Sequence, residues 1–554
     1  MFGGIGEGAM RTSILMIGVS LLSFGLVSAC SNRKQEAPKV TVAKKPVAPA
    51  VPRDLPNILV FSIDTLRADH LGSYGYTTDT SPNIDAFAKE AALFEHAVSQ
   101  APSTTPSHMS LFTGVTPAVH RVAGIGPEMK DPPLSLSLEK SIVTFPEMLK
   151  KQGYLTAGLH GGGMMAPVFG FFRGFDLYSS SLISFNWHRA YKDPSDLKPI
   201  EDILSLARKR KQPLFLFLHH YVCHVPYISA PDDLRFRFLN PKVPGLPTGI
   251  DDARKARFFD ALGKTPASKD VFTALRKAKD LITKNFWSQV DLSRPDHRRH
   301  IVALYDSGIL YADLLFGRVM DILKRTGDYE NTIIVLTSDH GEEFFEHGGK
   351  MHWNLFIEAL HVPMIIRFPR KLGDISKPAR IQADVRNMDL FPTLFEILGL
   401  PLERPVQGES FLPLLVKRDR TYHPRMLSYD PYLKGVRFID DGWIYSNQSS
   451  HNIPEWLFDR SGDPAEKNNL ASQKPDVMKA MQETAGRIGE DDRRFREKLT
   501  ALPGFEPPPA DPTVDGDLNA FGLSEPGGEA AAQDPDKVDE TLVEQLRALG
   551  YIQE

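Results

Sequence analysis

Three short apolar runs, each followed at once by polar residues, constrain the fold of this chain most strongly. Residues 57–63 are followed by Asp64, residues 213–218 lead into a histidine pair, and residues 332–337 are followed by Ser338. Such runs are typical of strands that are buried on both faces of a largely parallel sheet. Because α/β sheets bind ligands at the carboxyl ends of their strands, Asp64 is a candidate site residue.

Helical patterns and further strands separate these runs. A helix is predicted to open at Ser81–Pro82, with apolar residues recurring as far as Phe94. Another is predicted over 145–152, ending before Gly153, and a long amphipathic helix over 303–325, with Gly327 after it. Strands are predicted at 154–159 and 362–368. Together with the buried runs, these elements indicate an α/β fold.

The composition is that of a globular protein. The chain has 554 residues, 42% of them hydrophobic and 24% charged, and a length of this order suggests two or more domains. A net charge of −4 provides no basic surface for a polynucleotide, so we expect no nucleic-acid partner.

The first 30 residues are predicted to be a lipoprotein-type signal peptide. Arg11 precedes an apolar run over 14–27, which is short for a membrane span, and the run leads to Cys30. Residues 27–30 resemble a bacterial lipobox, in which the cysteine is acylated. A plain signal peptide or an uncleaved anchor is the alternative. Residues 31–54 are predicted to be a flexible tether, so we expect a lipid-anchored protein of the cell envelope, on the periplasmic or extracellular side of the membrane.

Residues 102–114 (PSTTPSHMSLFTG) form the most informative motif. Pro106 suits the first turn of a helix, which places Thr104 or Thr105 at or just before its N-cap. Free backbone N–H groups and the positive end of the helix dipole at that point favour an anion and stabilise an alkoxide. An ordinary capped helix is the alternative interpretation.

The same motif resembles the signature of the sulfatase family, which belongs to the alkaline-phosphatase superfamily. The pattern is Cys or Ser, any residue, Pro-Ser-Arg, and a hydrophobic turn that ends in Thr-Gly. Two positions differ: Thr104 stands where sulfatases form formylglycine, and His108 replaces the arginine. Because a threonine cannot be oxidised to an aldehyde, no formylglycine is expected. The resemblance implies that Thr104 is the nucleophile and that His108 binds substrate.

Two further motifs resemble the metal-binding segments of the family. Residues 64–72 match the first, with Thr65 where many sulfatases have a second aspartate, and residues 338–344 match the second. The resemblance implies a divalent metal held by Asp64, Asp339, His340 and the hydroxyl of Thr104. An imidazole beside oxygen ligands favours Zn or Mn, with Ca as a possible alternative.

Histidines supply the remaining predicted site residues. His224 matches the family's His-x-Pro-Tyr segment, which implies that it binds the anion or protonates the leaving group; a core histidine is the alternative. His220, four residues earlier, is predicted to bind substrate, or to share a second metal with His224. His352 occupies the position of the family's sulfate-binding lysine and is predicted to be catalytic. Its neighbour Lys350 is predicted to bind substrate.

The resemblance covers roughly residues 55–475 and implies an α/β/α sandwich with a smaller C-terminal antiparallel sheet. The catalytic domain is predicted over 55–418, with a lid-like insertion at 228–300, and the C-terminal subdomain over 419–500. Residues 501–540 are predicted to be a disordered linker, and residues 541–554 a short helix.

The predicted function is a metal-dependent hydrolase that cleaves anionic esters through Thr104, with phosphoesters or phosphonate esters favoured over sulfate esters. The substrate class is an anionic ester in a small molecule, a lipid headgroup or a glycan. Three alternatives remain: a true sulfatase, a phosphoglycerol- or phosphoethanolamine-type transferase, and a non-catalytic glycan-binding lipoprotein.

Overall fold

A computed structural model describes residues 54–123, 137–180, 197–227, 229–239, 286–416, 424–430, 435–448, 454–506 and 512–520, with isolated residues at 135, 243, 245, 246, 422 and 523. The predicted signal peptide, nearly all of the tether and the last predicted helix lie outside these residues, and the lid-like insertion is described only near its ends. No helix within the described ranges is long and apolar enough to cross a membrane.

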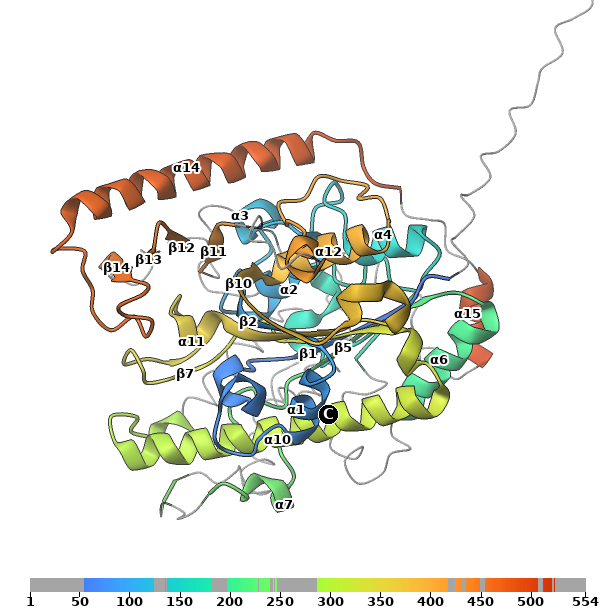
Figure 1. Cartoon of the computed structure of the whole chain (residues 1–554), viewed down its shortest axis with the longest axis horizontal. Coiled ribbons are helices and arrows are strands. Elements are labelled where there is room, and N and C mark those ends of the chain that lie inside the picture. The colour runs from blue at the N-terminus through green and yellow to red at the C-terminus, as the bar shows by residue number, and fades with distance from the viewer. Residues whose placement is uncertain are drawn as a thin grey trace, which may run out of the picture. The chain divides into compact units, whose positions relative to one another are not determined.

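An eight-stranded mixed sheet forms the centre of the fold (Figure 1). The spatial order is β10-β2-β9-β6-β1-β5-β3-β4, and only β9 runs antiparallel to its neighbours. The strands are β1 (Asn57–Ile63), β2 (Ala92–Val98), β3 (Leu155–Leu159), β4 (Leu177–Ser179), β5 (Leu214–His220), β6 (Thr332–Thr337), β9 (His361–Arg367) and β10 (Ala379–Arg386). Short apolar strands can occupy the middle of such a sheet because both of their faces are covered.

The register brings three strand ends together at one edge of the sheet. Ser62 of β1 pairs with His219 of β5 on one side and with Thr337 of β6 on the other. The residues that follow these positions therefore emerge side by side. This arrangement brings Asp64 and Asp339 together, although 275 positions separate them along the chain.

Helices cover both faces of the sheet (Figure 1). The first face packs on α1 (Pro82–Ala88), α6 (Lys198–Arg210) and the long α10 (Pro295–Thr326), around buried residues such as Phe61 and Phe316. The second packs on α2 (Thr104–Thr113), α4 (Phe145–Lys151) and α12 (Leu390–Ile397), around residues such as Phe217 and Phe391. Two separate apolar cores result, one on each side of the sheet, as expected for an α/β/α sandwich.

A second, antiparallel sheet follows in the C-terminal part, as predicted. It consists of β11 (Met426–Tyr429), β12 (Gly435–Asp440), β13 (Trp443–Gln448) and β14 (Trp456–Asp459). The helix α14 (Pro475–Thr500) covers it, with Met478, Met481 and Ile488 packed in the same cluster as Phe438 and Tyr445. The shorter elements are α3 (Pro117–His120), α7 (Asp232–Arg235), β7 (Glu343–Phe344), β8 (Lys350–Met351), α11 (Ile357–Leu360), α13 (Leu412–Val416) and α15 (Pro512–Ala520).

Three boundaries differ from the sequence predictions. The helix expected to extend towards Phe94 ends at Ala88, and residues 92–98 form β2. Its apolar spacing matched a helix, but Phe94 packs in the second core whereas Ile84 packs in the first. The long helix begins eight residues early, at Pro295, because proline is favoured in a first turn. The predicted linker contains α15, which Asp517 joins to Lys209 and Arg210 of α6 through ion pairs.

Candidate active site

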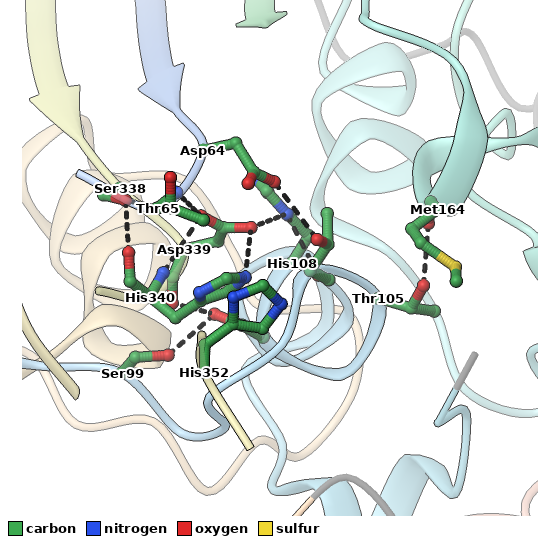
Figure 2. Close-up of polar contacts among 12 residues, drawn as sticks. Asp64, Thr65, Ser99, Thr105, His108, Met164, Ser338, Asp339, His340 and His352 are labelled. Atoms are coloured by element: carbon green, nitrogen blue, oxygen red, sulfur yellow. Dashed lines mark hydrogen bonds and ion pairs between the residues drawn. The ribbon is translucent and has the colours of Figure 1, made fainter. Parts of the chain in front are cut away.

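The N-terminus of α2 presents one of its two threonines to the site. Thr104 is the first helical residue, and its buried hydroxyl donates to Oδ2 of Asp64 at 3.1 Å. Thr105 instead donates to the backbone carbonyl of Met164 at 2.8 Å, as Figure 2 shows. The sequence left open which of the two threonines faces the site. Among the described residues, the Thr104 hydroxyl contacts the candidate ligand Asp64, whereas the Thr105 hydroxyl contacts Met164.

Two buried carboxylates face each other beside Thr104. Asp339 Oδ1 accepts the backbone N–H groups of Thr65 at 3.2 Å and His340 at 2.9 Å. Within the part of the chain that the structure describes, Asp64 Oδ1 and Asp339 Oδ2 have no hydrogen-bond partner. Burial and the nearby charge of Asp339 raise the pKa of Asp64 well above its usual value. Buried carboxylate oxygens without donors are costly unless a cation compensates them.

The imidazole of His340 completes this group. Its Nδ1 lies 2.9 Å from the carbonyl oxygen of Gly341, so Nδ1 carries the proton and Nε2 has a free lone pair. Nε2 is buried, has no partner among the described residues, and lies 3.5 Å from Asp339 Oδ2. Burial lowers the pKa of His340 to about 4, which keeps the ring neutral near pH 7.

These donors match what a divalent metal requires. One ligand atom each from Asp64, Asp339 and His340 lie within 4.8 Å of one another, and Figure 2 shows the three side chains converging. Two carboxylate oxygens and a neutral imidazole nitrogen form a set that suits Zn or Mn. The fit rests on three buried ligand atoms that have no hydrogen-bond partner among the residues that the structure describes.

His352 and His224 also reach this edge. The His352 ring lies 4.3 Å from that of His340 and 5.4 Å from that of His224, with Nδ1 3.3 Å from Oε1 of Glu342. Burial raises the pKa of Glu342 to about 7 and lowers that of His224 to about 4. His224 Nδ1 lies 2.8 Å from the carbonyl of Val225, so its Nε2 carries a lone pair. Binding an anionic oxygen and protonating a leaving group both require a proton on Nε2, so either role of His224 needs the imidazolium form, and both stay predictions.

His108 does not have the geometry of a substrate-binding residue. It is fully buried, with Nε2 2.9 Å from Ser62 Oγ and Nδ1 3.1 Å from the carbonyl of Thr104. Both ring nitrogens are thus occupied by contacts that fix α2 against β1. The predicted direct contact of His108 with substrate is therefore not supported by the structure.

His220 lies on the other face of the sheet. Its ring packs edge-on against Phe61 at 5.3 Å, and Phe61 contacts Phe316 of α10. Successive residues of a strand point to opposite faces, so His220 turns away from Thr104 when His219 turns towards it. The predicted substrate-binding role of His220, and a second metal shared with His224, are not supported by this placement.

Sequence reasoning missed His219, the neighbour of His220. The His219 side chain is fully buried, and its Nε2 lies 3.6 Å from Asp64 Oδ2. It forms a group with His108 and Asp339 in which one nitrogen or oxygen atom of each residue lies within 4.8 Å of the others. Strand alternation was the signal available in the sequence: Ser62, Asp64 and His219 follow the face of Val60 and Phe217, which belong to the second core.

Lys350 lies at the edge of the predicted site. It is the first residue of β8, its side chain is exposed, and its Nζ lies 4.7 Å above the ring of Trp287. A substrate role for Lys350 remains a prediction.

A second cluster of acids and histidine lies a few residues further along the chain. His347 Nδ1 contacts Oε1 of Glu358 at 2.6 Å, and His347 Nε2 contacts the carbonyl of Glu466 at 2.9 Å. Glu343 Oε1 accepts the backbone N–H groups of His347 and Gly349 at 2.9 and 2.7 Å, and Oε2 accepts from Asn354. This cluster has the composition of a metal site, but protein partners already occupy its ligand atoms.

Comparison with known proteins assigns the class. Residues 56–400 match the family model described as "Sulfatase", and residues 346–490 match "N-sulphoglucosamine sulphohydrolase, C-terminal". The first match spans more than half of the chain, which therefore belongs to the sulfatase family of hydrolases. It is 26% identical over 485 residues to an N-acetylgalactosamine-6-O-sulfatase of Bacteroides thetaiotaomicron, covering 77% of this chain and 92% of that protein.

Solved structures share the fold. The phosphonate monoester hydrolase of Agrobacterium radiobacter superposes with a TM-score of 0.58 at 18% identity, over 79% of this chain and 96% of that one. A protein solved in complex with its substrate D-glucosamine-2-N,6-O-disulfate gives 0.58 at 19% identity, over 80% and 99%. The predicted α/β/α architecture is thus confirmed.

Proposed function

We propose that this protein is a metal-dependent hydrolase that cleaves an anionic ester through Thr104, and that phosphoesters or phosphonate esters are better substrates than sulfate esters. The observation that carries the proposal is the contact of Thr104 with Asp64 at 3.1 Å, at the start of α2 and beside three unsatisfied ligand atoms. This position of the hydroxyl supports a nucleophilic role for Thr104.

The chain's own residues divide the remaining work. Asp64, Asp339 and His340 would hold the metal, which when bound stabilises negative charge on oxygen. Thr104 Oγ attacks the phosphorus while the bond to the leaving oxygen breaks, and Asp64 Oδ2 is within reach of the Thr104 proton. The N-terminus of α2 favours negative charge on the transferred group. His224 and His352 bind the ester. Water then attacks the phosphorus and releases the transferred group from Thr104.

Thr104 supports the phosphoester preference. In the formylglycine mechanism, a hemiacetal expels the bound sulfate by elimination. A threonyl ester has no second hydroxyl on the same carbon and must be hydrolysed directly, and sulfate esters of alcohols hydrolyse poorly. A phosphoryl or phosphonyl group on Thr104 can still be released by attack of water on phosphorus.

A true sulfatase is the second candidate, because the curated relatives carry sulfatase names, among them the iduronate 2-sulfatase of Homo sapiens at 24% identity over 474 residues. The deciding experiment measures kcat/KM of the metal-loaded protein on an aryl phosphonate monoester, an aryl phosphodiester and an aryl sulfate. Phosphonate or phosphodiester turnover above sulfate turnover, abolished in Thr104→Ala, would support the first proposal. Sulfate turnover that depends on Thr104 and exceeds the other two would replace it.

We also propose that Cys30 carries a lipid that tethers the enzyme to the cell envelope. The support is the lipobox-like residues 27–30 after an apolar run. Cys30→Ala should move the protein from the membrane fraction to the soluble fraction of cells that express the full chain. An unchanged distribution would contradict a lipid anchor.

A further inference from the structure

His219 and His340 face the same carboxylates but have opposite backbone partners. His340 Nδ1 faces a carbonyl oxygen, so its Nε2 is a lone pair. His219 Nδ1 instead accepts the backbone N–H of Gly161 at 3.4 Å, so its proton resides on Nε2. A neutral imidazole is a donor at one nitrogen and an acceptor at the other, and the partner of one nitrogen fixes the role of the second.

The surroundings of Gly161 preserve this contact. A Cβ at Gly161 would lie 2.5 Å from Cδ2 of Tyr221, and the Tyr221 ring stands edge-on to His219 at 4.7 Å. On its other side, His219 meets the ring of His108 edge-on at 4.9 Å. The two rings and the glycine backbone hold the imidazole in one orientation, with Nε2 3.6 Å from Asp64 Oδ2.

We propose that His219 is a positioning residue that donates its Nε2–H to Oδ2 of Asp64 and leaves Oδ1 as the metal ligand. The separation of 3.6 Å is longer than a hydrogen bond, as is common for such contacts in unliganded sites. Partners that hold a ligating carboxylate or imidazole typically change metal affinity 10- to 100-fold when removed. The inference rests on the proposed function only in assuming that the site binds a metal.

Two substitutions separate this role from direct ligation. His219→Gln keeps an N–H donor near the position of Nε2, whereas His219→Asn keeps an acceptor for Gly161 and loses that donor. Dissociation constants for Mn²⁺ and Zn²⁺, measured on the full chain by competition with a fluorescent chelator, are independent of turnover. We expect Asn to weaken binding about 10- to 100-fold and Gln to stay close to the wild type.

Equal losses in both variants, or no loss in His219→Asn, would overturn the proposal. His220→Asn is the matched control: it removes a buried histidine from the other face of the same strand and should leave metal affinity unchanged. If His219→Asn does not fold, the Gln variant alone decides, because a loss of more than about tenfold in it contradicts a donor role.

A different observation supports a second inference. A cavity of about 720 Å³ lies where the N-terminal turns of α10 meet the segment after β7. Its lining residues include Arg298 and Arg299 together with Phe238, Phe344 and Phe345. Arg67, three residues after Asp64, borders the wall through its ion pair with Glu346 at 2.6 Å.

The two arginines of this cavity are not paired with its two carboxylates. Its two carboxylates are engaged elsewhere: Asp306 binds Tyr76 Oη and His70 Nδ1, each at 2.8 Å, and Glu346 binds Arg67. Among the described residues, Arg298 and Arg299 form no ion pair, although Arg298 stacks over Phe345 at 5.6 Å. The two arginines, the half-buried rings of Phe238 and Phe345 and the positive end of the α10 dipole together complement a ring that carries an anionic group.

We infer that this cavity binds a sugar that carries a sulfate or phosphate ester, as an accessory site for a larger anionic glycan substrate. It deepens the proposed function by naming the substrate class. A cavity of this size can enclose a monosaccharide or disaccharide.

Calorimetry on the Thr104→Ala protein tests this inference without turnover. The probe is D-glucosamine-2-N,6-O-disulfate, with unsulfated glucosamine and inorganic sulfate as comparisons. We expect two sugar-binding sites per chain, one of which weakens at least tenfold in Arg298→Ala/Arg299→Ala. Arg294→Ala, which removes an arginine paired with Asp296 at 2.7 Å outside the lining, should leave both sites intact.

An isotherm unchanged by the double substitution would overturn the accessory site. Inorganic sulfate that binds the cavity as tightly as the sugar would overturn the assignment to a sugar. Both readouts measure binding alone, so neither depends on whether Thr104 is the nucleophile.

Discussion

The segment after β6 contains two clusters of the same residue types in opposite states. In the first, Asp339 Oδ2 and His340 Nε2 are buried, and no described residue satisfies them. In the second, both nitrogens of His347 and both oxygens of Glu343 have protein partners. Residue types alone do not distinguish a metal site from a structural hydrogen-bond network. The distinction is which ligand atoms the fold leaves without a hydrogen-bond partner.

The backbone makes this difference. One ring nitrogen of His340 is held by its neighbour's carbonyl, which leaves the other for a ligand. His347 is held at both nitrogens by oxygen atoms, an arrangement that suits the charged imidazolium. Through Glu466, which pairs with the buried Arg437 of β12, this second cluster fastens the loop to the C-terminal sheet.

The largest expected effect comes from Thr104, the proposed nucleophile, which lies beside the first cluster. Thr104→Ala should lower kcat on the best ester by about 10³-fold or more, because it removes the atom that forms the covalent intermediate. Thr105→Ala is the matched control: its hydroxyl serves only the carbonyl of Met164 among the described residues, so its kcat should change far less. Similar losses in both variants would contradict Thr104 as the nucleophile.

Gly341 lies between the clusters, and Gly341→Ala should disturb both. A Cβ there would come within 2.0 Å of the carbonyl oxygen of Glu358. We expect a loss of about 3 kcal/mol in the free energy of unfolding, measured by urea denaturation, together with weaker metal binding. Gly486→Ala, on α14 with open space around it, should be neutral or stabilising. A neutral result at Gly341 would show that the strand ends can move apart freely.

Removing the metal should affect only the first cluster. A metal present at 100 times its dissociation constant stabilises the folded state by about 2.7 kcal/mol, so a chelator should lower the melting temperature of the wild type. This shift should vanish in Asp339→Asn and persist in Glu343→Gln. A chelator effect that disappears in Glu343→Gln instead would place the metal in the second cluster.

The smallest effect concerns the charge of His347. Hydrogen bonding to Glu358 raises the pKa of His347 above its usual value, against the opposing effect of burial. The stabilisation that charged His347 gives to the folded state is therefore complete below the pKa of the unfolded chain, near 6.5. It is lost as the pH rises through the higher pKa of the folded state. In His347→Gln, the decline of the unfolding free energy above pH 6.5 should become shallower. An unchanged slope would show that His347 is neutral in the fold.

Much of this arrangement could be predicted from the sequence, for a simple reason. The buried runs before Asp64 and Asp339 indicate parallel strands whose carboxyl ends lie at the same edge of the sheet, and in the structure their register brings the two carboxylates together. It is harder to predict to which face of the sheet a particular side chain points. His219 and His220 are neighbours in β5 and point to opposite faces of the sheet. Which of them reaches the site depends on which core each face of the strand contacts.

Two other failures have the same origin in three-dimensional packing. The residues of β2 continue the apolar spacing of α1, and only the alternation of Leu93 and Phe94 between the two cores distinguishes the strand from a helix. His108 of α2 contacts Ser62 Oγ, which belongs to β1, and the carbonyl of Thr104, which lies one helical turn earlier. No local pattern of residues reports whether a ring nitrogen is already occupied.

The antiparallel strand β9 of the eight-stranded sheet has a consequence for how such enzymes can diversify. Because β9 runs opposite to β6, the chain leaves and re-enters the sheet at the same edge, and residues 338–360 need no crossover. Insertions, deletions or exchanges in this segment therefore leave strand order and register untouched. Lys350 and His352, whose roles towards the substrate are predicted from the sequence, lie within it, so changes of substrate would concentrate in a stretch whose two ends stay fixed in the sheet.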